Sequence, residues 1–316
     1  MSLVLWSTTK MAEISFGSKR IAVVTGGNKG IGFEISRQLA ANGVGVVLTA
    51  RDVRRGTEAV EKLKASYGLS DVVFHQLDVT DPSSIASLAE FLKTQLGNLT
   101  FWLVNNAAVI GSVFLTDDKE KLAIGPDDLI GPKAGNKNQV LKQTYETAGD
   151  CLKTNYYGIK QLTEALIPLL QQSDSARIVN VSSQLGQLRV IPNEKAKKEL
   201  VDGDSLTEEK VDNLVEGFLE DVKQNLVEAK SWPTNFSAYT VSKAALNAYT
   251  RVLAKKYSNK IAINAVCPGF TDTDMNNHTG VFTTEEAAKG PVKLALLPDN
   301  GVSGLFFEQT ELSTFE

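Results

Sequence analysis

Cysteine and histidine are scarce in this chain, which has 2 cysteines and 2 histidines among 316 residues. Cys151 and Cys267 cannot build a disulfide framework, and we interpret them as buried thiols of a reduced, intracellular protein. Two histidines, His75 and His278, are few for a zinc centre or a Ser/His/Asp hydrolase site, because both kinds of site usually rely on suitably placed histidines. We therefore expect no metal site, and any chemistry must use another acid or base.

Long apolar runs and an excess of positive charge are also missing. No stretch approaches the roughly 20 apolar residues that cross a bilayer, and the start of the chain lacks the pattern of a secretion signal. The formal net charge of −4 gives no global field that favours nucleic acid or anionic lipid. We therefore expect a cytoplasmic protein with no nucleic-acid or membrane partner, and residues 1–20 as a flexible N-terminal extension.

The chain does have 42% hydrophobic residues, arranged as short β-rich runs that alternate with helical patterns. Strands are expected at 21–25, 44–49, 72–76, 101–104, 177–181, 261–266 and 304–308. Helices are expected from about residue 32 and at about 54–66, 82–95, 150–171 and 238–257. This alternation predicts an α/β fold, a Rossmann-type doubly wound parallel sheet of about seven strands, as a single domain over 21–316.

Two stretches, at about 111–149 and 187–236, interrupt this rhythm and are interpreted as insertions over the same domain. In the second, Ser205-Leu-Thr-Glu208 resembles a capping box, and apolar residues follow at helical spacing, which predicts a helix over about 207–230. Its apolar face either packs on the core, forms a lid over a binding cleft, or covers an interface.

A glycine-rich turn, Thr25-Gly-Gly-Asn-Lys-Gly-Ile-Gly32, joins the first strand to the first helix. Glycine lets the backbone approach a pyrophosphate, and a helix N-terminus offers it unpaired N–H groups. The spacing differs from G-x-G-x-x-G and a plain turn is the alternative, but the strand before and helix after favour a dinucleotide site. The expected contacts are Thr25, Gly26, Asn28, Lys29, Gly30, Ile31 and Gly32.

Basic residues gather directly after the second strand. Arg51, Arg54 and Arg55 stand there, and Lys29 lies in the glycine turn. Guanidinium groups suit the 2′-phosphate of NADPH, whereas the 2′-hydroxyl of NADH favours an acidic partner. The alternative is a solvated basic turn, and Asp52 adds an opposite charge. We predict NADPH/NADP+ as cofactor, with Arg51 and Arg55 among its contacts.

Tyr239 and Lys243 are separated by four residues at the start of a predicted helix, so they share one face. A free phenol has a pKa near 10, and a nearby ammonium or a cationic nicotinamide favours its ionised form. Such a tyrosine can exchange a proton with a substrate oxygen. Taken alone, the spacing also fits a packed tyrosine beside a lysine that reaches solvent.

Together with other motifs, this pair gives the chain a close resemblance to the short-chain dehydrogenase/reductases over about residues 20–310. Each motif after a strand lies at its carboxyl end, where open α/β sheets bind ligands. The matching residues are the turn Thr25–Gly32, Asp78, Asn105-Asn-Ala107, Asn155, Ser182-Ser183, Tyr239, Lys243 and Pro268-Gly269.

The resemblance implies a role for each catalytic residue. Tyr239 is the acid, and Ser183 hydrogen-bonds the carbonyl oxygen, whereas Ser182 packs. Lys243 holds the nicotinamide ribose and lowers the tyrosine pKa, and Asn155 orders a proton-relay water. The hydride comes from the cofactor.

It also implies the remaining cofactor contacts and two departures from the family pattern. Asp78 meets adenine, Asn105 the adenosine ribose, and Thr273 the carboxamide or pyrophosphate; Val79, Pro268 and Gly269 complete the set. Ala108 replaces a usual glycine, where its methyl group tightens the pocket floor or excludes a positive φ, and Thr271 replaces a common branched apolar residue. Neither removes a catalytic group, so activity is expected to survive.

The interval between Ser183 and Tyr239, 56 residues, is long and resembles that of monomeric carbonyl reductases, which implies a monomer. The 111–149 insertion, Asn28-Lys29 and Ser231-Trp-Pro233 are similar to the plant salutaridine reductase and menthone (neomenthol) reductase group.

That likeness implies reduction of a bulky apolar cyclic ketone, such as a monoterpenoid or an alkaloid, to an alcohol. One member that reduces an enone double bond lacks the tyrosine, so the presence of Tyr239 favours carbonyl reduction. The alternatives are a broad-specificity detoxifying carbonyl reductase and a non-catalytic NADPH-binding regulatory protein; the intact set Asn155, Ser183, Tyr239 and Lys243 weighs against the latter.

Overall fold

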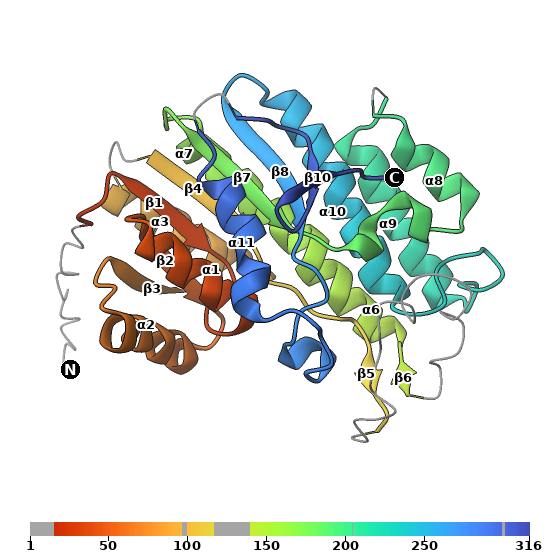
Figure 1. Ribbon diagram of the computed structural model, residues 1–316. Coiled ribbons are helices and arrows are strands. Elements are labelled where there is room, and N and C mark those ends of the chain that lie inside the picture. Colours follow the sequence, from red (N-terminus) through yellow and green to blue (C-terminus); the bar gives the residue numbers. More distant parts are fainter. Residues whose placement is uncertain (1–15, 97–99, 117–139, 204, 299–300) are drawn as a thin grey trace, which may run out of the picture.

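A central eight-stranded sheet organises the chain (Figure 1). The computed structural model describes residues 16–96, 100–116, 140–203, 205–298 and 301–316. The strand order is β3-β2-β1-β4-β7-β8-β9-β10, and every neighbouring pair is parallel except β9 and β10. The bounds are β1 Arg20–Val24, β2 Gly45–Ala50, β3 Val72–Gln76, β4 Thr100–Asn105, β7 Ala176–Val181, β8 Ile261–Cys267, β9 Phe306–Glu308 and β10 Glu311–Ser313. The predicted seven parallel strands are confirmed, and the antiparallel edge strand β10 adds an eighth.

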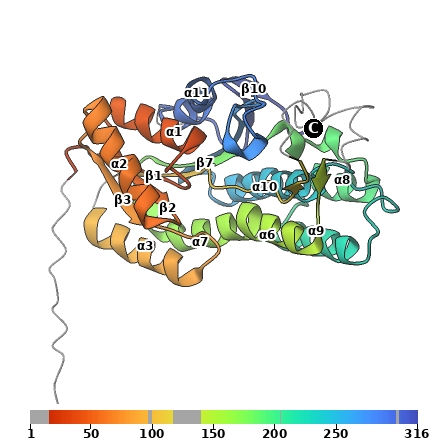
Figure 2. The same ribbon diagram turned by 90° about the horizontal axis from the view of Figure 1, so that it is seen from below.

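Helices cover both faces of this sheet (Figure 2). One layer holds α1, α2 and α11, and the other holds α3, α7 and α10. Their bounds are α1 Gly30–Ala41, α2 Val53–Tyr67, α3 Pro82–Leu96, α6 Tyr145–Leu152, α7 Ile159–Leu170, α8 Glu194–Val201, α9 Glu208–Lys223, α10 Ser237–Lys256 and α11 Thr284–Ala295.

Alternate side chains along each strand point to opposite faces of the sheet, so one strand contributes to the apolar cores on both faces. In β1, Ile21 and Val23 join the core under α3 and α7, whereas Ala22 and Val24 join the core under α1, α2 and α11. All four are fully buried. A parallel strand that is apolar on both faces needs this double cover, which is why the β-rich runs were readable in the sequence.

The strand order reverses between β1 and β4. From β1 the chain adds β2 and β3 on one side, and from β4 it adds β7, β8 and β9 on the other. The loops that leave β1 and β4 therefore diverge at their carboxyl ends and open a crevice. The candidate site lies there.

The predicted helix at 150–171 is interrupted. Helix α6 ends at Leu152, a π-helical turn spans Lys153–Gly158, and α7 follows at once. A π-helical turn inserts one extra residue per turn and re-aims the side chains it carries, and such turns are frequent at functional sites. Asn155 lies within this turn.

The second insertion contains α8 and α9, and α9 packs across α6 and α10. Its predicted apolar face is buried at Val211, Leu214, Val215 and Phe218. The predicted capping box is wrong, because Thr207 and not Ser205 is the N-cap; the Thr207 hydroxyl accepts from the Lys210 N–H. The helix also ends at Lys223, before the predicted residue 230.

The position of α9 bears on the lid alternative. No residue of α9 lines either of the two pockets described below, so the structure does not support the lid. Tyr156 and Lys160 bind Asp212 of α9 through distances of 2.8 Å and 2.5 Å to its carboxylate oxygens. The helix is thus fixed on the outer face of α6, α7 and α10.

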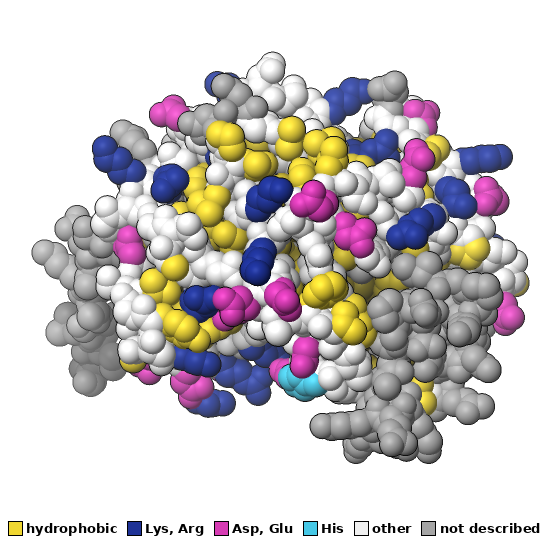
Figure 3. Space-filling view, viewed as in Figure 1, with side chains coloured by type: hydrophobic (Ala, Val, Ile, Leu, Met, Phe, Trp, Pro, Cys, Tyr) yellow, Lys and Arg dark blue, Asp and Glu magenta, His cyan; other side chains and the backbone are white. Residues whose placement is uncertain are grey.

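The first insertion begins and ends in a short antiparallel ladder, β5 Val113–Phe114 with β6 Leu141–Lys142. Residues 117–139 between them lie outside the described residues, as do residues 1–15 of the expected N-terminal extension. In the part of the chain that is described, no helix is long and apolar enough to span a membrane. Acidic and basic side chains are interspersed over the face shown in Figure 3.

Candidate active site

The turn after β1 is shaped for close approach of another molecule. Gly26 has a φ of 65°, a conformation that side chains with a Cβ rarely adopt. A Cβ on Gly32 would lie 2.4 Å from the Gly26 carbonyl oxygen, so only glycine fits where α1 begins. Lys29, at the N-cap of α1, makes no side-chain capping hydrogen bond. The N-terminus of α1 therefore faces the crevice with N–H groups and the positive end of the helix dipole.

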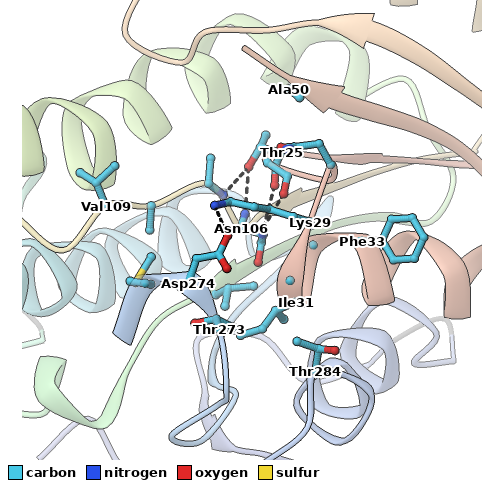
Figure 4. A pocket seen from close by; sticks show the side chains of 18 of the residues that line it. Thr25, Lys29, Ile31, Phe33, Ala50, Asn106, Val109, Thr273, Asp274 and Thr284 are labelled. Carbon is cyan, nitrogen blue, oxygen red and sulfur yellow. Dashed lines mark hydrogen bonds and ion pairs between the residues drawn. The ribbon is translucent and has the colours of Figure 1, made fainter. Parts of the chain in front are cut away.

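The glycine turn is fastened to the loop after β4 by Thr25 and Asn106 (Figure 4). The Thr25 hydroxyl accepts from the Asn106 and Ala107 N–H groups, both at 2.9 Å, and Asn106 Nδ2 donates to the Thr25 carbonyl at 2.9 Å. These hydrogen bonds fix the distance between the glycine turn and the loop after β4, the two loops that border the crevice.

Asn105, predicted to contact the adenosine ribose, faces away from the crevice. Its side chain is 1% exposed and donates a hydrogen bond to Asn180 Oδ1 of the neighbouring strand β7 at 2.8 Å. The next residue, Asn106, lines the crevice instead. A strand presents successive side chains to opposite faces, so a shift of one residue reverses the assignment.

The crevice has a volume of about 1360 Å³, larger than the 300–1,000 Å³ that suit drug-sized ligands. A dinucleotide-sized molecule would fit it. On its far side Asp274, in the 3-10 turn Asp274–Asn276 after β8, pairs with Lys29 of the glycine turn at 2.6 Å (Figure 4). Both side chains are more than half exposed, so this pair contributes little to stability.

Basic side chains from the residue that follows β2 and from α2 line one end of this crevice. Arg51, Arg55 and Lys62 all face it. Asp52, the opposite charge noted in the sequence, caps α2 by accepting from the Arg55 N–H at 2.8 Å and does not line the crevice. Lys62 was not predicted from the sequence, although it lies seven residues after Arg55 and hence on the same face of α2.

Tyr239, Lys243 and Ser183 meet where the crevice joins a smaller apolar pocket. Tyr239 lines both cavities, Lys243 lines the crevice and Ser183 lines the pocket. The Lys243 Nζ lies 5.6 Å from the centre of the Tyr239 ring. Burial raises the pKa of Tyr239 above its usual value, and its hydrogen bond with Ser183 opposes that rise. The phenol is therefore protonated at neutral pH.

Lys243 is a buried cation. Its side chain is 2% exposed, and its Nζ donates to the Val181 carbonyl at 2.8 Å. Burial lowers the lysine pKa to about 8, and Cys151 and Cys267 oppose this shift. Below that pH the ammonium lies close to the phenol, where it favours the phenolate once the proton has left.

The two adjacent serines are distinguished by their partners. The Ser182 hydroxyl donates to Asn247 Oδ1 at 2.6 Å, which ties it to α10. The Ser183 hydroxyl accepts from the Leu185 N–H at 3.2 Å and is the one that reaches Tyr239.

Asn155 stands behind the cavity wall. It is fully buried, and its side chain both donates to the Val109 carbonyl and accepts from the Val109 N–H, at 2.8 Å each. It also donates to the Ser242 hydroxyl at 3.1 Å. The Asn155 side chain therefore holds the loop after β4 against α10 and lines neither cavity.

The remaining predicted residues all line one of the two cavities. Those not yet placed are Asn28, Gly30, Ile31, Asp78, Val79, Pro268, Gly269 and Thr273. Ala108 lines the crevice without a positive φ, and the buried Thr271 hydroxyl donates to the Gly269 carbonyl at 3.0 Å. The two departures from the family pattern are thus accommodated.

The smaller pocket was not predicted residue by residue. Its walls are mostly apolar and come from five separate segments: Ile31, Ile110 with Phe114, Leu185, Phe236, and Phe270 with Met275. No periodic pattern links these positions in the sequence, so only the folded chain could bring them together. Over the described residues, no cluster of three or more His, Cys, Asp or Glu side chains could hold a metal ion.

Comparisons with known proteins agree with this architecture. Residues 20–194 match the short chain dehydrogenase family model, and residues 222–299 match a model described as enoyl-(acyl carrier protein) reductase. The chain is 54% identical to salutaridine reductase of Papaver bracteatum, over 94% of this chain and 96% of that one. It is 53% identical to (+)-neomenthol dehydrogenase of Arabidopsis thaliana, over 94% and 98%.

Among solved structures, that of salutaridine reductase from Papaver somniferum superposes with a TM-score of 0.84 at 52% identity, over 92% of this chain and 99% of that one. Members of the family generally bind NAD(P), and the glycine turn, the free N-terminus of α1 and the size of the crevice suit such a cofactor. The chain is an oxidoreductase that belongs to the short-chain dehydrogenase/reductase family.

Proposed function

We propose that this chain uses NADPH to reduce the carbonyl group of a bulky, apolar cyclic ketone to an alcohol. The observation that carries the proposal is the junction of the two cavities, where Tyr239 touches both the dinucleotide-sized crevice and the apolar pocket. Relatives named salutaridine reductase and neomenthol dehydrogenase support a ketone of the alkaloid or monoterpenoid class.

In this proposal the chain's own residues move and hold the proton. Tyr239 donates its phenolic proton to the carbonyl oxygen, and the Ser183 hydroxyl donates a hydrogen bond to that oxygen. Lys243 binds the nicotinamide ribose, and its ammonium stabilises the phenolate that forms. Asn155 fixes the loop after β4 beside the reacting groups and, as the family resemblance implies, orders the water that returns a proton to Tyr239. Bound NADPH supplies the hydride that reaches the carbonyl carbon.

The raised pKa of Tyr239 favours this direction of reaction. Reduction consumes a protonated tyrosine, which burial provides at neutral pH. Oxidation of an alcohol would need the phenolate and therefore a higher pH.

Selectivity for NADPH is proposed to come from the basic end of the crevice. Arg51 and Arg55 are placed to make charge-assisted hydrogen bonds to a 2′-phosphate, and Asp52 is engaged as a helix cap. We expect Arg51→Ala to raise the KM for NADPH by about tenfold, equivalent to ~1.4 kcal/mol, and to leave that for NADH nearly unchanged. Steady-state kinetics with both cofactors measures this. A wild-type enzyme that prefers NADH would contradict the proposal.

We further propose that residues 21–316 act as one domain and that the protein is a cytoplasmic monomer. Strands of one sheet come from Arg20 through Ser313, and α9 covers the outer face of α6 and α10. A dimer in size-exclusion chromatography, or exclusion of a fluorescent fusion from the cytoplasm, would argue against this.

The function is tested by following loss of NADPH absorbance with menthone, an alkaloid ketone and simple quinones. We expect the wild type to oxidise NADPH with a bulky cyclic ketone. The kcat of Tyr239→Phe should fall by at least about 100-fold, because the proton donor is gone and a general acid contributes on the order of 10² to 10⁴ in rate. Tyr257→Phe, which removes a tyrosine hydroxyl far from both cavities, is the control. No oxidation with any carbonyl would favour the non-catalytic alternative, and full activity of Tyr239→Phe would exclude this tyrosine as the acid.

A further inference from the structure

The helix that carries Tyr239 begins without a cap of its own. Phe236 is the N-cap residue of α10, and its side chain makes no capping hydrogen bond. Its backbone is left-handed, with a φ of 51°, a region that a bulky residue adopts only where the surroundings hold it. Uncapped N–H groups at a buried helix start are costly, so another part of the chain must satisfy them.

Gln143 supplies that cap from a distant segment. Its Oε1 accepts from the Ala238 N–H at 2.9 Å, and its side-chain amide also exchanges hydrogen bonds with the Ser237 hydroxyl at 2.8 Å and 3.1 Å. Ser237 and Ala238 are the first two residues of α10, and Tyr239 is the third. The cap thus acts on the turn that orients the tyrosine.

Gln143 belongs to the end of the first insertion. It directly follows β6 and directly precedes Thr144, which caps α6. The adjoining residues Val140 and Leu141 pack against Phe236, with Tyr239 beside them. The insertion therefore contacts the start of α10 at two points: Gln143 accepts a hydrogen bond from Ala238, and Val140 and Leu141 make apolar contact with Phe236.

The start of α10 borders the apolar pocket. Phe236 and Tyr239 line it together with Phe114 of the same insertion and with Ile110, which directly precedes that insertion. A small movement of the first turn of α10 would displace the phenol from Ser183 and open the wall that Phe236 forms. Misplacement of a reacting group by about 1 Å can cost on the order of 100-fold in rate.

We propose that Gln143 is a positioning residue for the reaction: by capping α10 from the first insertion, it holds Tyr239 against Ser183 and Phe236 against the substrate. This inference rests on the proposed carbonyl reduction. Gln143 lines neither cavity, so it acts through α10 and does not touch the reacting atoms.

The test compares Gln143→Leu with Gln143→Glu. Leucine is of similar size without an acceptor, whereas glutamate keeps the acceptor oxygens and adds a charge that suits a helix N-terminus. We expect Gln143→Leu to lower kcat by about tenfold or more with the KM for NADPH unchanged, and Gln143→Glu to restore kcat to within about threefold of wild type. The solvent deuterium isotope effect on kcat should rise in Gln143→Leu, because proton transfer from a displaced Tyr239 becomes slower.

Thr207→Val is the matched control. It removes the N-cap of α9, which lines no described pocket, and should lower the melting temperature as Gln143→Leu does while leaving kcat unchanged. Should Gln143→Leu not fold, Ser237→Ala removes only the hydroxyl partner of Gln143 and should show a smaller loss of kcat in the same direction.

Two results would overturn the inference. Wild-type kcat and isotope effect in Gln143→Leu, with a melting loss like that of Thr207→Val, would make Gln143 a structural cap only. Equal loss in Gln143→Leu and Gln143→Glu would show that the acceptor oxygen is not what matters. A wild-type enzyme inactive with every carbonyl would instead remove the proposed function, and this inference with it.

Discussion

Lys243 carries a stability cost at the scale of a single residue. Its ammonium is buried with a backbone carbonyl as hydrogen-bond partner, and its pKa is lowered to about 8. In the unfolded chain the pKa is near 10.4. Between these values the unfolded state binds more protons than the folded state, so this group's contribution makes the protein more stable as pH rises from about 8 to about 10.4. Below pH 8 the folded protein bears the full free-energy cost of burying the charged Lys243 side chain.

We therefore predict that Lys243→Met stabilises the cofactor-free protein at pH 7 by about 1–3 kcal/mol while it abolishes turnover. Methionine keeps the volume and removes the buried charge. The gain should shrink towards zero as the pH approaches 10.4. Chemical denaturation at pH 7 and at pH 10 measures both; a less stable variant at pH 7 would contradict the argument.

The adjacent pairs Asn105-Asn106 and Ser182-Ser183 mark the limit of residue-level inference. In each pair, one side chain is buried and donates a hydrogen bond to another element: Asn105 to Asn180, and Ser182, which also borders both cavities, to Asn247. The other member lines a cavity, Asn106 the crevice and Ser183 the apolar pocket. The sequence predicts that Ser183 and Asn105 contact the ligands. The structure places Ser183 at a cavity but buries Asn105 away from both cavities. Which member turns outward depends on the last residue of the strand, and a boundary error of one residue reverses it.

At the scale of elements, α9 is held by a buried polar contact. Asp212 accepts from the Tyr156 hydroxyl and pairs with Lys160, and Tyr156 is fully buried. Burial, together with the Asp212 carboxylate, raises the pKa of Tyr156 well above its usual value, so it remains a hydrogen-bond donor at all working pH.

Asp212→Ala is predicted to lower the free energy of unfolding by about 2–3 kcal/mol, because it leaves a buried hydroxyl and an ammonium without this acceptor. KM values should not change, since α9 lines neither cavity. Urea denaturation measures the loss. Glu199→Ala, which removes an exposed partner of Lys195, is the control and should cost no more than about 0.5 kcal/mol. A raised KM in Asp212→Ala with normal stability would restore the lid alternative.

At the scale of the whole molecule, one sheet brings the parts of the site together from most of the chain. The glycine turn, the basic start of α2, the loop after β4 and the start of α10 all lie at the carboxyl ends of strands. The first insertion lines the pocket with Phe114 and caps α10 with Gln143, and α9 of the second insertion buries the outer face of α6 and α10.

The sequence by itself determined the parallel sheet and the order of its strands along the chain, and it supplied the residues that we propose for catalysis. Strands buried on both faces must be apolar throughout, and a glycine turn between strand and helix needs particular residues in consecutive positions. Such signals are local and can be read from a single stretch such as Thr25–Gly32.

Only the tertiary structure decided how distant segments meet. It placed Asn106 instead of Asn105 at the crevice, fixed α9 away from the pocket, and capped α10 with Gln143, which lies 95 residues before Ala238. A hydrogen bond or an apolar wall between such residues leaves no periodic pattern in either segment. Its existence depends on the packing of the whole sheet and its helices, which no short stretch of sequence encodes alone.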